Sequence, residues 1–252
     1  MPASQLEFGG ALALGIGPAL AFLYLSLRRF DRPFTEYTLF DDRRVFGGLA
    51  VGLVFGALAS LLDTSVLRLA FDFASSLAVL FALYAVDELF KLIYLNRKGY
   101  RGRFDTTFYG VALGVGIAAT VIVGSVVWVA LPQLQVDVGA DLVVDLLGLL
   151  LFSISLSLVH ADTGALLGFG AAHGDFWPAL LRALAIRFAH GALLLPFFLG
   201  APRVWGLVST ATSLVFASIL YHYVYNRVLP ETLPDDIRRE MRRERRARPV
   251  KE

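Results

Sequence analysis

The chain has 252 residues, of which 57% are hydrophobic and 17% are charged, with a net charge of +2 at pH 7. Soluble domains carry about 25% charged and about 45–50% apolar residues, so this composition excludes a soluble globular protein and indicates an integral membrane protein. The chain has no cysteine, which excludes disulfides, thiolate nucleophiles and cysteine-ligated metals.

Seven apolar segments follow one another along the chain, and a helix needs about 20 such residues to cross a bilayer. The predicted spans are residues 8–27, 45–62, 66–94, 104–131, 142–172, 179–200 and 204–226. The second and third are separated only by a short turn at Asp63, and Asp72 interrupts the third. The fifth is long for one helix, and a break near His160, Asp162 and Thr163 would raise the number of spans to eight.

Basic residues mark alternate connections between these segments. The basic regions are loop 28–44 and loop 91–103, with five Lys or Arg each, and the tail 227–252. The intervening connections, at Asp63, 132–141 and 201–203, are nearly free of basic residues. The positive-inside rule then places the N-terminus outside and the C-terminus in the cytoplasm. The sequence therefore predicts an all-α, polytopic transmembrane bundle at residues 1–226, multi-pass in the plasma membrane.

The tail 227–252 forms a separate charged, cytoplasmic region. A helix start is predicted at 233–236, where acids precede seven arginines between Arg238 and Arg248. The tail is interpreted as a solvated helix that fixes the topology, with binding to anionic membrane lipid as the alternative. Nucleic acid is not an expected partner, because no aromatic residues alternate with the arginines.

Glycines recur at every fourth position in three of the spans. They are Gly48, Gly52 and Gly56; Gly110 and Gly114; and Gly164 and Gly168. Small residues at this spacing let helix backbones approach closely, so these spans are predicted to pack against one another.

Ionisable residues inside membrane spans are costly, and a functional role is the default interpretation. With a helical rise of about 1.5 Å per residue, Glu88 lies about 33 Å along the third span and His160 about 27 Å along the fifth. His190 lies about 16 Å from the cytoplasmic start of the sixth span. Glu88, His160 and His190 are therefore expected in the same, cytoplasmic half of the bilayer.

The acidic end of the third span contains Asp87, Glu88 and Lys91. Lys91 follows Glu88 by one helical turn, so it falls on the same face and would hold that carboxylate ionised. The alternative is that Asp87 and Glu88 only anchor a helix end and pair with Lys91 or Arg97. The corresponding alternative for His160 is that its side chain only hydrogen-bonds a neighbouring backbone group.

The sequence lacks several motifs of membrane proteases. It has no H-E-x-x-H for a zinc metalloprotease, no Gly-x-Gly-Asp for an aspartyl protease, and no G-x-S-x-G for a serine nucleophile. The chemistry left is activation of water by a carboxylate with histidines, with or without a metal.

The acidic end also resembles a family motif. Asp87-Glu88-x-x-Lys91 is similar to the E-E-x-x-K motif of the PrsW-type membrane proteases, relatives of the CAAX prenyl proteases and bacteriocin-processing enzymes. The segment 104–118, FDTTFYGVALGVGIA, resembles the fourth-span signature of that family.

Two later histidines extend the resemblance. His160, with Gly168 eight residues on, and His190-Gly191 are similar to the family's histidine spans, so the likeness covers about residues 84–195. The family's fourth span usually continues Gly-Phe-Ala-x-x-Glu-Asn, and this chain has Val121 at the glutamate position.

The resemblance implies an intramembrane peptidase that hydrolyses membrane-anchored peptides near the cytoplasmic side. Glu88 and Asp87 would be the catalytic acids, with Glu88 as general base toward a water. His160 and His190 would position the water, or would bind with Glu88 a divalent metal such as zinc that carries it.

Two further residues would support this chemistry. Lys91 would tune the carboxylate, and Arg187, one turn before His190, would bind a substrate carboxylate or carbonyl. Because of Val121, the alternative is a catalytically silent pseudoprotease that binds membrane partners. A transporter that uses Asp72, His160 and Asp162 as a proton path is the second alternative.

Overall fold

The computed structural model describes residues 5–31, 35, 38–67, 73–130, 140–199 and 201–247, and every regular element within those ranges is helical. The long helices are α1 (Gln5–Leu27), α2 (Asp42–Leu67), α3 (Phe73–Leu95), α4 (Thr106–Ser125), α6 (Ala140–His173), α7 (Phe176–Phe198) and α8 (Arg203–Tyr223). The shorter elements are η1 (Arg28–Phe30), η2 (Val126–Ala130), η3 (Val224–Val228), α9 (Leu229–Glu231) and α10 (Asp235–Ala247). Asp72 and most of the predicted loop 132–141 lie outside the described residues.

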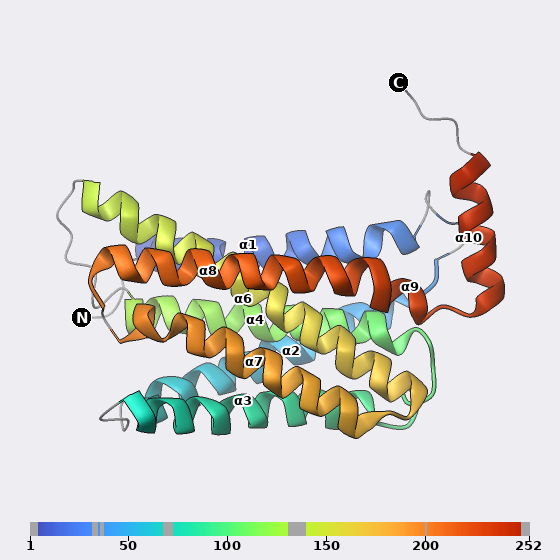
Figure 1. Cartoon of the computed structure of the whole chain (residues 1–252), viewed down its shortest axis with the longest axis horizontal. Coiled ribbons are helices and arrows are strands. Elements are labelled where there is room, and N and C mark those ends of the chain that lie inside the picture. The colour runs from blue at the N-terminus through green and yellow to red at the C-terminus, as the bar shows by residue number, and fades with distance from the viewer. Residues whose placement is uncertain are drawn as a thin grey trace.

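The long helices lie side by side along the longest axis of the molecule, with the two termini toward opposite ends (Figure 1). One end carries the turn between α3 and α4 and the C-terminal helices α9 and α10, and we call it the basic end. Helix α10 begins at Asp235, as the sequence predicts. Its first turn carries Asp235 and Asp236, where acids suit the positive end of the helix dipole.

Six helical segments of the described residues are long and apolar enough to cross a membrane. They are Glu7–Phe30, Asp42–Asp63, Thr106–Trp128, Leu142–His173, Phe176–Phe198 and Arg203–Glu231. This confirms an all-helical membrane protein. Helix α3 is not among the six, and it carries the three ionisable residues Asp87, Glu88 and Lys91 in its second half.

Two predicted boundaries are wrong. The turn expected at Asp63 does not form, because α2 continues through Asp63 to Leu67. The break considered near His160 and Asp162 does not form either, since α6 is one helix from Ala140 to His173. Both corrections have the same physical reason: a single polar residue does not stop a helix whose neighbours have good helical propensity and whose backbone hydrogen bonds continue.

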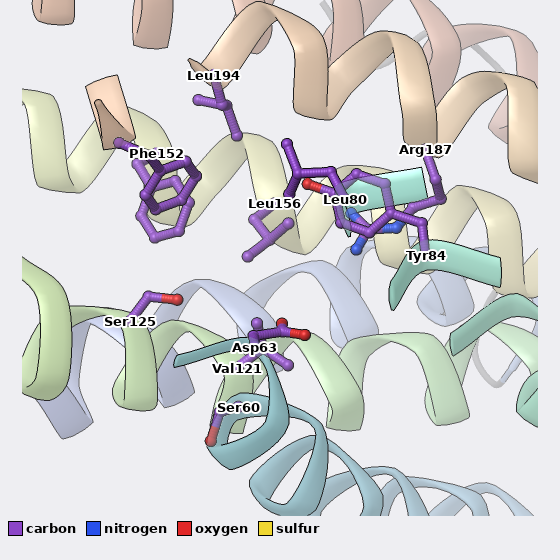
Figure 2. Close-up of a pocket in the computed structure, with 11 residues that line it drawn as sticks. Ser60, Asp63, Leu80, Tyr84, Val121, Ser125, Phe152, Leu156, Arg187 and Leu194 are labelled. Atoms are coloured by element: carbon purple, nitrogen blue, oxygen red, sulfur yellow. The ribbon is translucent and has the colours of Figure 1, made fainter. Parts of the chain in front are cut away.

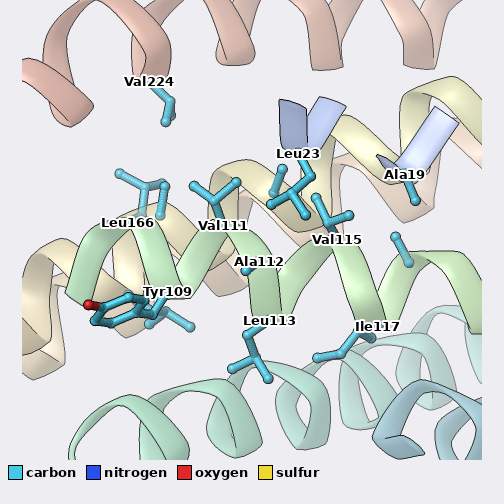
Figure 3. Close-up of a cluster of buried hydrophobic side chains, with 14 of the residues drawn as sticks. Ala19, Leu23, Tyr109, Val111, Ala112, Leu113, Val115, Ile117, Leu166 and Val224 are labelled. Carbon is cyan, nitrogen blue, oxygen red and sulfur yellow. The ribbon is translucent and has the colours of Figure 1, made fainter. Parts of the chain in front are cut away.

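Helix α4 forms the centre of the bundle. Nearly all of its residues are buried, and it packs mainly against α2, α6 and α1. Figure 3 shows its apolar side chains, including Val111, Leu113 and Ile117, pointing toward the helices around it. A helix buried on all sides is apolar all round, which explains why α4 lacks an amphipathic pattern.

The recurring glycines are the points where helices touch α4. A Cβ on Gly52 would lie 2.9 Å from the Ile117 nitrogen, so α2 packs directly on the α4 backbone. On the opposite side, Gly110 meets the Gly164 backbone of α6, and Gly114 meets the carbonyl of His160. The packing predicted from glycine spacing is confirmed, and it fixes the position of His160 against α4.

Candidate functional site

The acidic end of α3 is inside the protein and does not face solvent. Asp87 is 4% exposed, and Glu88 and Lys91 are both 0% exposed. Burying three ionisable side chains within five residues has a large desolvation cost, which must be offset by pairing with one another and with neighbouring groups. Their partners come from α6 and α7.

Glu88 and Lys91 form a closed ring of hydrogen bonds with Thr163. Lys91 Nζ donates to Glu88 Oε1 at 2.7 Å and to Thr163 Oγ1 at 2.8 Å. Thr163 Oγ1 in turn donates to Glu88 Oε1 at 3.2 Å. The prediction that Lys91 and Glu88 share a helix face and pair is confirmed, and the ring binds α3 to α6.

Arg187 brings α7 to the same acids. Its Nη2 lies 3.4 Å from Asp87 Oδ2, and its Nε lies 3.4 Å from Glu88 Oε1 without hydrogen-bond alignment. The guanidinium also stacks over the Tyr84 ring, 4.3 Å from its centre. Tyr84 fits there because Gly191, next to it on α7, has no side chain to collide with the ring.

His160 lies on α6 one turn before Thr163, whose hydroxyl contacts both the His160 carbonyl and Glu88. The imidazole is fully buried and lies within electrostatic range of Lys91, Arg187 and His190. Its two ring nitrogens have no hydrogen-bond partner among the described residues. The alternative that His160 only hydrogen-bonds a backbone therefore finds no support in these contacts.

His190 is held from the other side. Its Nε2 lies 3.2 Å from Ser155 Oγ of α6, and Ser213 of α8 donates to that hydroxyl at 3.2 Å. His190 Nδ1 has no partner within the described part of the chain. The chain thus orients one nitrogen of this imidazole and leaves the other available.

The site gathers an unusual set of buried polar atoms that lack a partner among the described residues. They are Glu88 Oε2, both ring nitrogens of His160, His190 Nδ1 and Arg187 Nη1. Buried polar groups are nearly always hydrogen-bonded, to protein or to ordered water, so several such atoms from three helices call for an explanation. We call Asp87, Glu88, His160, Arg187 and His190 the acid–histidine cluster.

A metal does not fit this cluster. Among the described residues, no three His, Cys, Asp or Glu side chains come together in a way that could hold a metal ion, so Glu88, His160 and His190 do not form the expected zinc site. The physical reason is the position of the cations. Lys91 and Arg187 both lie against Glu88 Oε1, and their positive charges would repel a metal cation bound to this carboxylate.

A pocket of about 530 Å³, a volume that includes the open solvent at its mouth, reaches the cluster at Arg187 (Figure 2). Its polar lining residues are Ser60, Asp63, Tyr84, Ser125 and Arg187, and the rest are Leu, Phe and Val. Of the predicted site residues, only Arg187 is in the lining. The helices that contribute to it are α2, α3, α4, α6 and α7.

The pocket lies in the half of the bundle away from the basic end. Ser125 and Phe198, the last residues of α4 and α7, are both in its lining. Val121, where the resemblance implies a glutamate, also lines the pocket, close to Asp63 in Figure 2.

Sequence reasoning missed Asp63, Thr163, Tyr84 and Ser155. Asp63 was assigned to a turn, yet an acid within a long apolar segment is itself a signal of function. Thr163, one turn after His160, was noted only as the site of a helix break. Nothing in the sequence distinguishes Tyr84 or Ser155 from the many aromatic and hydroxyl residues of the other spans.

Three other polar residues lie away from the cluster. Asp162 is fully buried and its Oδ2 has no partner among the described residues. It lies within electrostatic range of Tyr221 of α8, which is not a member of the cluster. His173 and His222 are exposed. His173 is hydrogen-bonded to Phe169 of its own helix, and His222 to Asn226 of the adjoining η3.

The comparisons with known proteins give no family for this chain. No protein-family profile, no curated protein and no solved structure matches it.

Proposed function

We propose that this protein is an intramembrane peptidase of the PrsW type, which hydrolyses membrane-anchored peptides in the acid–histidine cluster. The observation that carries the proposal is the set of buried, unpartnered polar atoms on Glu88, His160 and His190. Water molecules bound beside them would satisfy the carboxylate acceptor and the imidazole nitrogens. This is also the arrangement that general-base hydrolysis requires.

Glu88 is the general base. Its Oε1 is held by Lys91 and Thr163, so Oε2 is the oxygen left to take a proton from water. The water oxygen attacks the peptide carbonyl carbon, and the proton passes from Glu88 to the leaving nitrogen as the C–N bond breaks. Lys91 and Thr163 hold this carboxylate in place before the attack.

The other members of the cluster position the reactants. His160 and His190 orient the water through their unpartnered nitrogens. Arg187 Nη1 donates to the carbonyl oxygen and stabilises the negative charge that develops there. Asp87 holds Arg187 in place through the contact at 3.4 Å.

The positive-inside rule puts the basic end in the cytoplasm, so the protein has its N-terminus outside and α3 as a seventh span of the plasma membrane. In that orientation the pocket lies in the outer half of the bundle. The peptide then reaches Arg187 from the outer side, whereas the resemblance implies hydrolysis near the cytoplasmic side.

The test is cleavage of transmembrane peptides by the purified protein in detergent. Replacing Glu88→Gln keeps the size and hydrogen bonds of the side chain but removes the base, so the cleavage rate should fall about 10²–10⁴-fold. Glu231→Gln, at an exposed position, is the matched control and should cleave like the wild type. Equal rates for wild type and Glu88→Gln would reject the enzymatic proposal.

The second candidate is a pseudoprotease that binds membrane peptides without cleaving them. It is favoured by one observation, that Val121 lines the pocket at the position where the resemblance implies a second acid. Under this alternative the wild type binds but does not cleave, and Val121→Glu gains cleavage activity.

A further inference from the structure

Asp63 is a polar residue of the pocket that the proposed mechanism does not use. It lies on α2, four residues before the helix ends, and it lines the pocket together with Arg187 of α7. Asp63 lies within electrostatic range of both Asp87 and Arg187. Figure 2 shows its carboxyl beside Val121, with Arg187 pointing toward the same region from the side of Tyr84.

Among the described residues, Asp63 is the acid of this region that forms no ion pair with a cation. Glu88 is in contact with Lys91 at 2.7 Å, and Arg187 contacts Asp87 and Glu88 at 3.4 Å each. A carboxyl in a membrane-embedded pocket is costly unless it accepts hydrogen bonds or meets a positive group. Asp63 therefore favours a ligand that donates hydrogen bonds to it.

Arg187 has a hydrogen-bond donor that lacks an acceptor among the described residues. Its side chain is 1% exposed, its Nη1 has no partner among the described residues, and it lines the same pocket. An unpartnered guanidinium N–H favours a ligand that supplies a hydrogen-bond acceptor. Between these two residues the pocket is lined by apolar side chains such as Leu80, Leu156 and Leu194.

We propose that Asp63 and Arg187 together recognise an amide group carried on an apolar chain. The carbonyl oxygen accepts from Arg187 Nη1, the N–H donates to the Asp63 carboxyl, and the hydrocarbon on either side packs on the leucines. A peptide bond between apolar residues is the group that has this chemistry. The inference deepens the proposed function by naming Asp63 as a substrate-binding residue, but the binding it describes needs no catalysis.

The experiment compares two probes of the same chain length that differ in the N–H donor. Octanamide has a carbonyl and an N–H, whereas methyl octanoate has the carbonyl alone. The thermal unfolding midpoint of the full-length protein in lipid nanodiscs is measured against the concentration of each probe. Because only the amide can donate a hydrogen bond to the Asp63 carboxyl, we expect the wild type to bind octanamide about tenfold more tightly than the ester.

Asp63→Leu removes the carboxyl at similar volume and should abolish the preference for the amide. Asp63→Glu keeps the carboxyl group and should retain the preference, and it keeps the test decisive if the leucine variant fails to fold. Asp42→Leu, at an exposed position on the same helix, is the matched control and should behave like the wild type. A preference that persists in Asp63→Leu, or that is absent from the wild type and Asp63→Glu, overturns the inference.

The outcome is independent of the outcome for catalysis. If the wild type cleaves no peptide but prefers octanamide through Asp63, the amide site stands and the peptidase proposal falls. If the wild type cleaves peptides in a Glu88-dependent way and Asp63→Leu keeps the preference, only the role of Asp63 falls.

Discussion

At the scale of single residues, the protein depends on charges that are buried in pairs. Glu88 and Lys91 are both fully buried and bonded at 2.7 Å, and Thr163 completes the hydrogen bonds of the pair. Removing one partner of a buried ion pair leaves the other charge uncompensated, which costs more than the pair contributes to stability. These residues are therefore sensitive to single substitutions and more tolerant of paired ones.

Lys91→Met tests this dependence. We expect the variant to lose about 3–5 kcal/mol of unfolding free energy, because the cation left to Glu88 in the described part of the chain is the more distant Arg187. Chemical unfolding in mixed micelles measures the loss. The double variant Glu88→Gln/Lys91→Met should recover part of it.

The control for Lys91→Met is an exposed pair. Arg238 and Asp235 on α10 lie 2.5 Å apart, with side chains 31% and 78% exposed. Solvent-exposed pairs contribute about 0–1 kcal/mol, so Arg238→Met should be close to the wild type. A Lys91→Met variant as stable as this control would contradict the pairing.

Asp105, at the end of the basic turn just before α4, links stability to pH. Burial works to raise the pKa of its carboxyl, but hydrogen bonds from Arg103 and Tyr109 and the charges of Arg103 and Arg44 lower that pKa below its usual 3.8. A lowered pKa means that the ionised carboxyl stabilises the fold. The contribution is complete at pH values above 3.8 and is lost as the pH falls through the lower pKa of the folded state.

Asp105→Asn is therefore expected to lower the unfolding free energy at neutral pH by about 1–3 kcal/mol, the value of hydrogen bonds to a charged group. The difference from the wild type should shrink as the pH is lowered below 3.8 and through the lower pKa of the folded state, because the wild-type carboxyl then takes up its proton. Unfolding at several pH values measures it. A difference that does not change with pH would show that Asp105 acts only by its shape.

At the scale of elements, close packing on α4 determines how the site is assembled. The helices α2 and α6 both touch the α4 backbone at glycines, Gly52 on one side and Gly164 on the other. His160 and Thr163 lie on α6 next to these contacts. A displacement of α6 from α4 would therefore move an imidazole and a hydroxyl of the site together.

Gly52→Ala is the test at this scale. Its new methyl group would approach Ile117 N at 2.9 Å and Gly116 Cα at 3.0 Å, and these backbone atoms do not yield as a side chain would. We expect a loss of about 1–3 kcal/mol in unfolding free energy.

Gly47→Ala on the same helix is the matched control, because no atom lies within 4 Å of its added Cβ. It should be neutral or slightly stabilising, since alanine favours a helix more than glycine does. Equal effects of the two alanines would mean that α2 and α4 are not in close contact.

At the scale of the whole molecule, the charges at the two ends of the bundle predict its orientation. The turn between α3 and α4 carries exposed basic residues, including Lys98, whereas the turn between α7 and α8 at Pro202 lies at the opposite end. The positive-inside rule places Lys98 in the cytoplasm.

The absence of natural cysteines makes this orientation directly measurable. In intact cells, a membrane-impermeant maleimide should label Pro202→Cys but not Lys98→Cys, and both should react after the membrane is opened. The reverse pattern would invert the topology and would put the pocket on the cytoplasmic side.

The sequence by itself determined that the protein is a helical membrane protein and where most of its spans lie, because long apolar segments have no other stable arrangement in a bilayer. It also predicted two local features, the glycine contacts and the pairing of Glu88 with Lys91, since both follow from the period of one helix. Depth along the spans brought Glu88, His160 and His190 to a common region.

Only the tertiary structure decided which of these side chains face one another. It paired Arg187 with Asp87 and Glu88, placed Thr163 between Glu88 and Lys91, and brought Asp63 from α2 into the pocket of Arg187. Depth along a span gives one coordinate, whereas contacts between helices depend also on rotation and on which helices are neighbours. Those are set by the packing of every helix around α4, which no single segment of the sequence specifies.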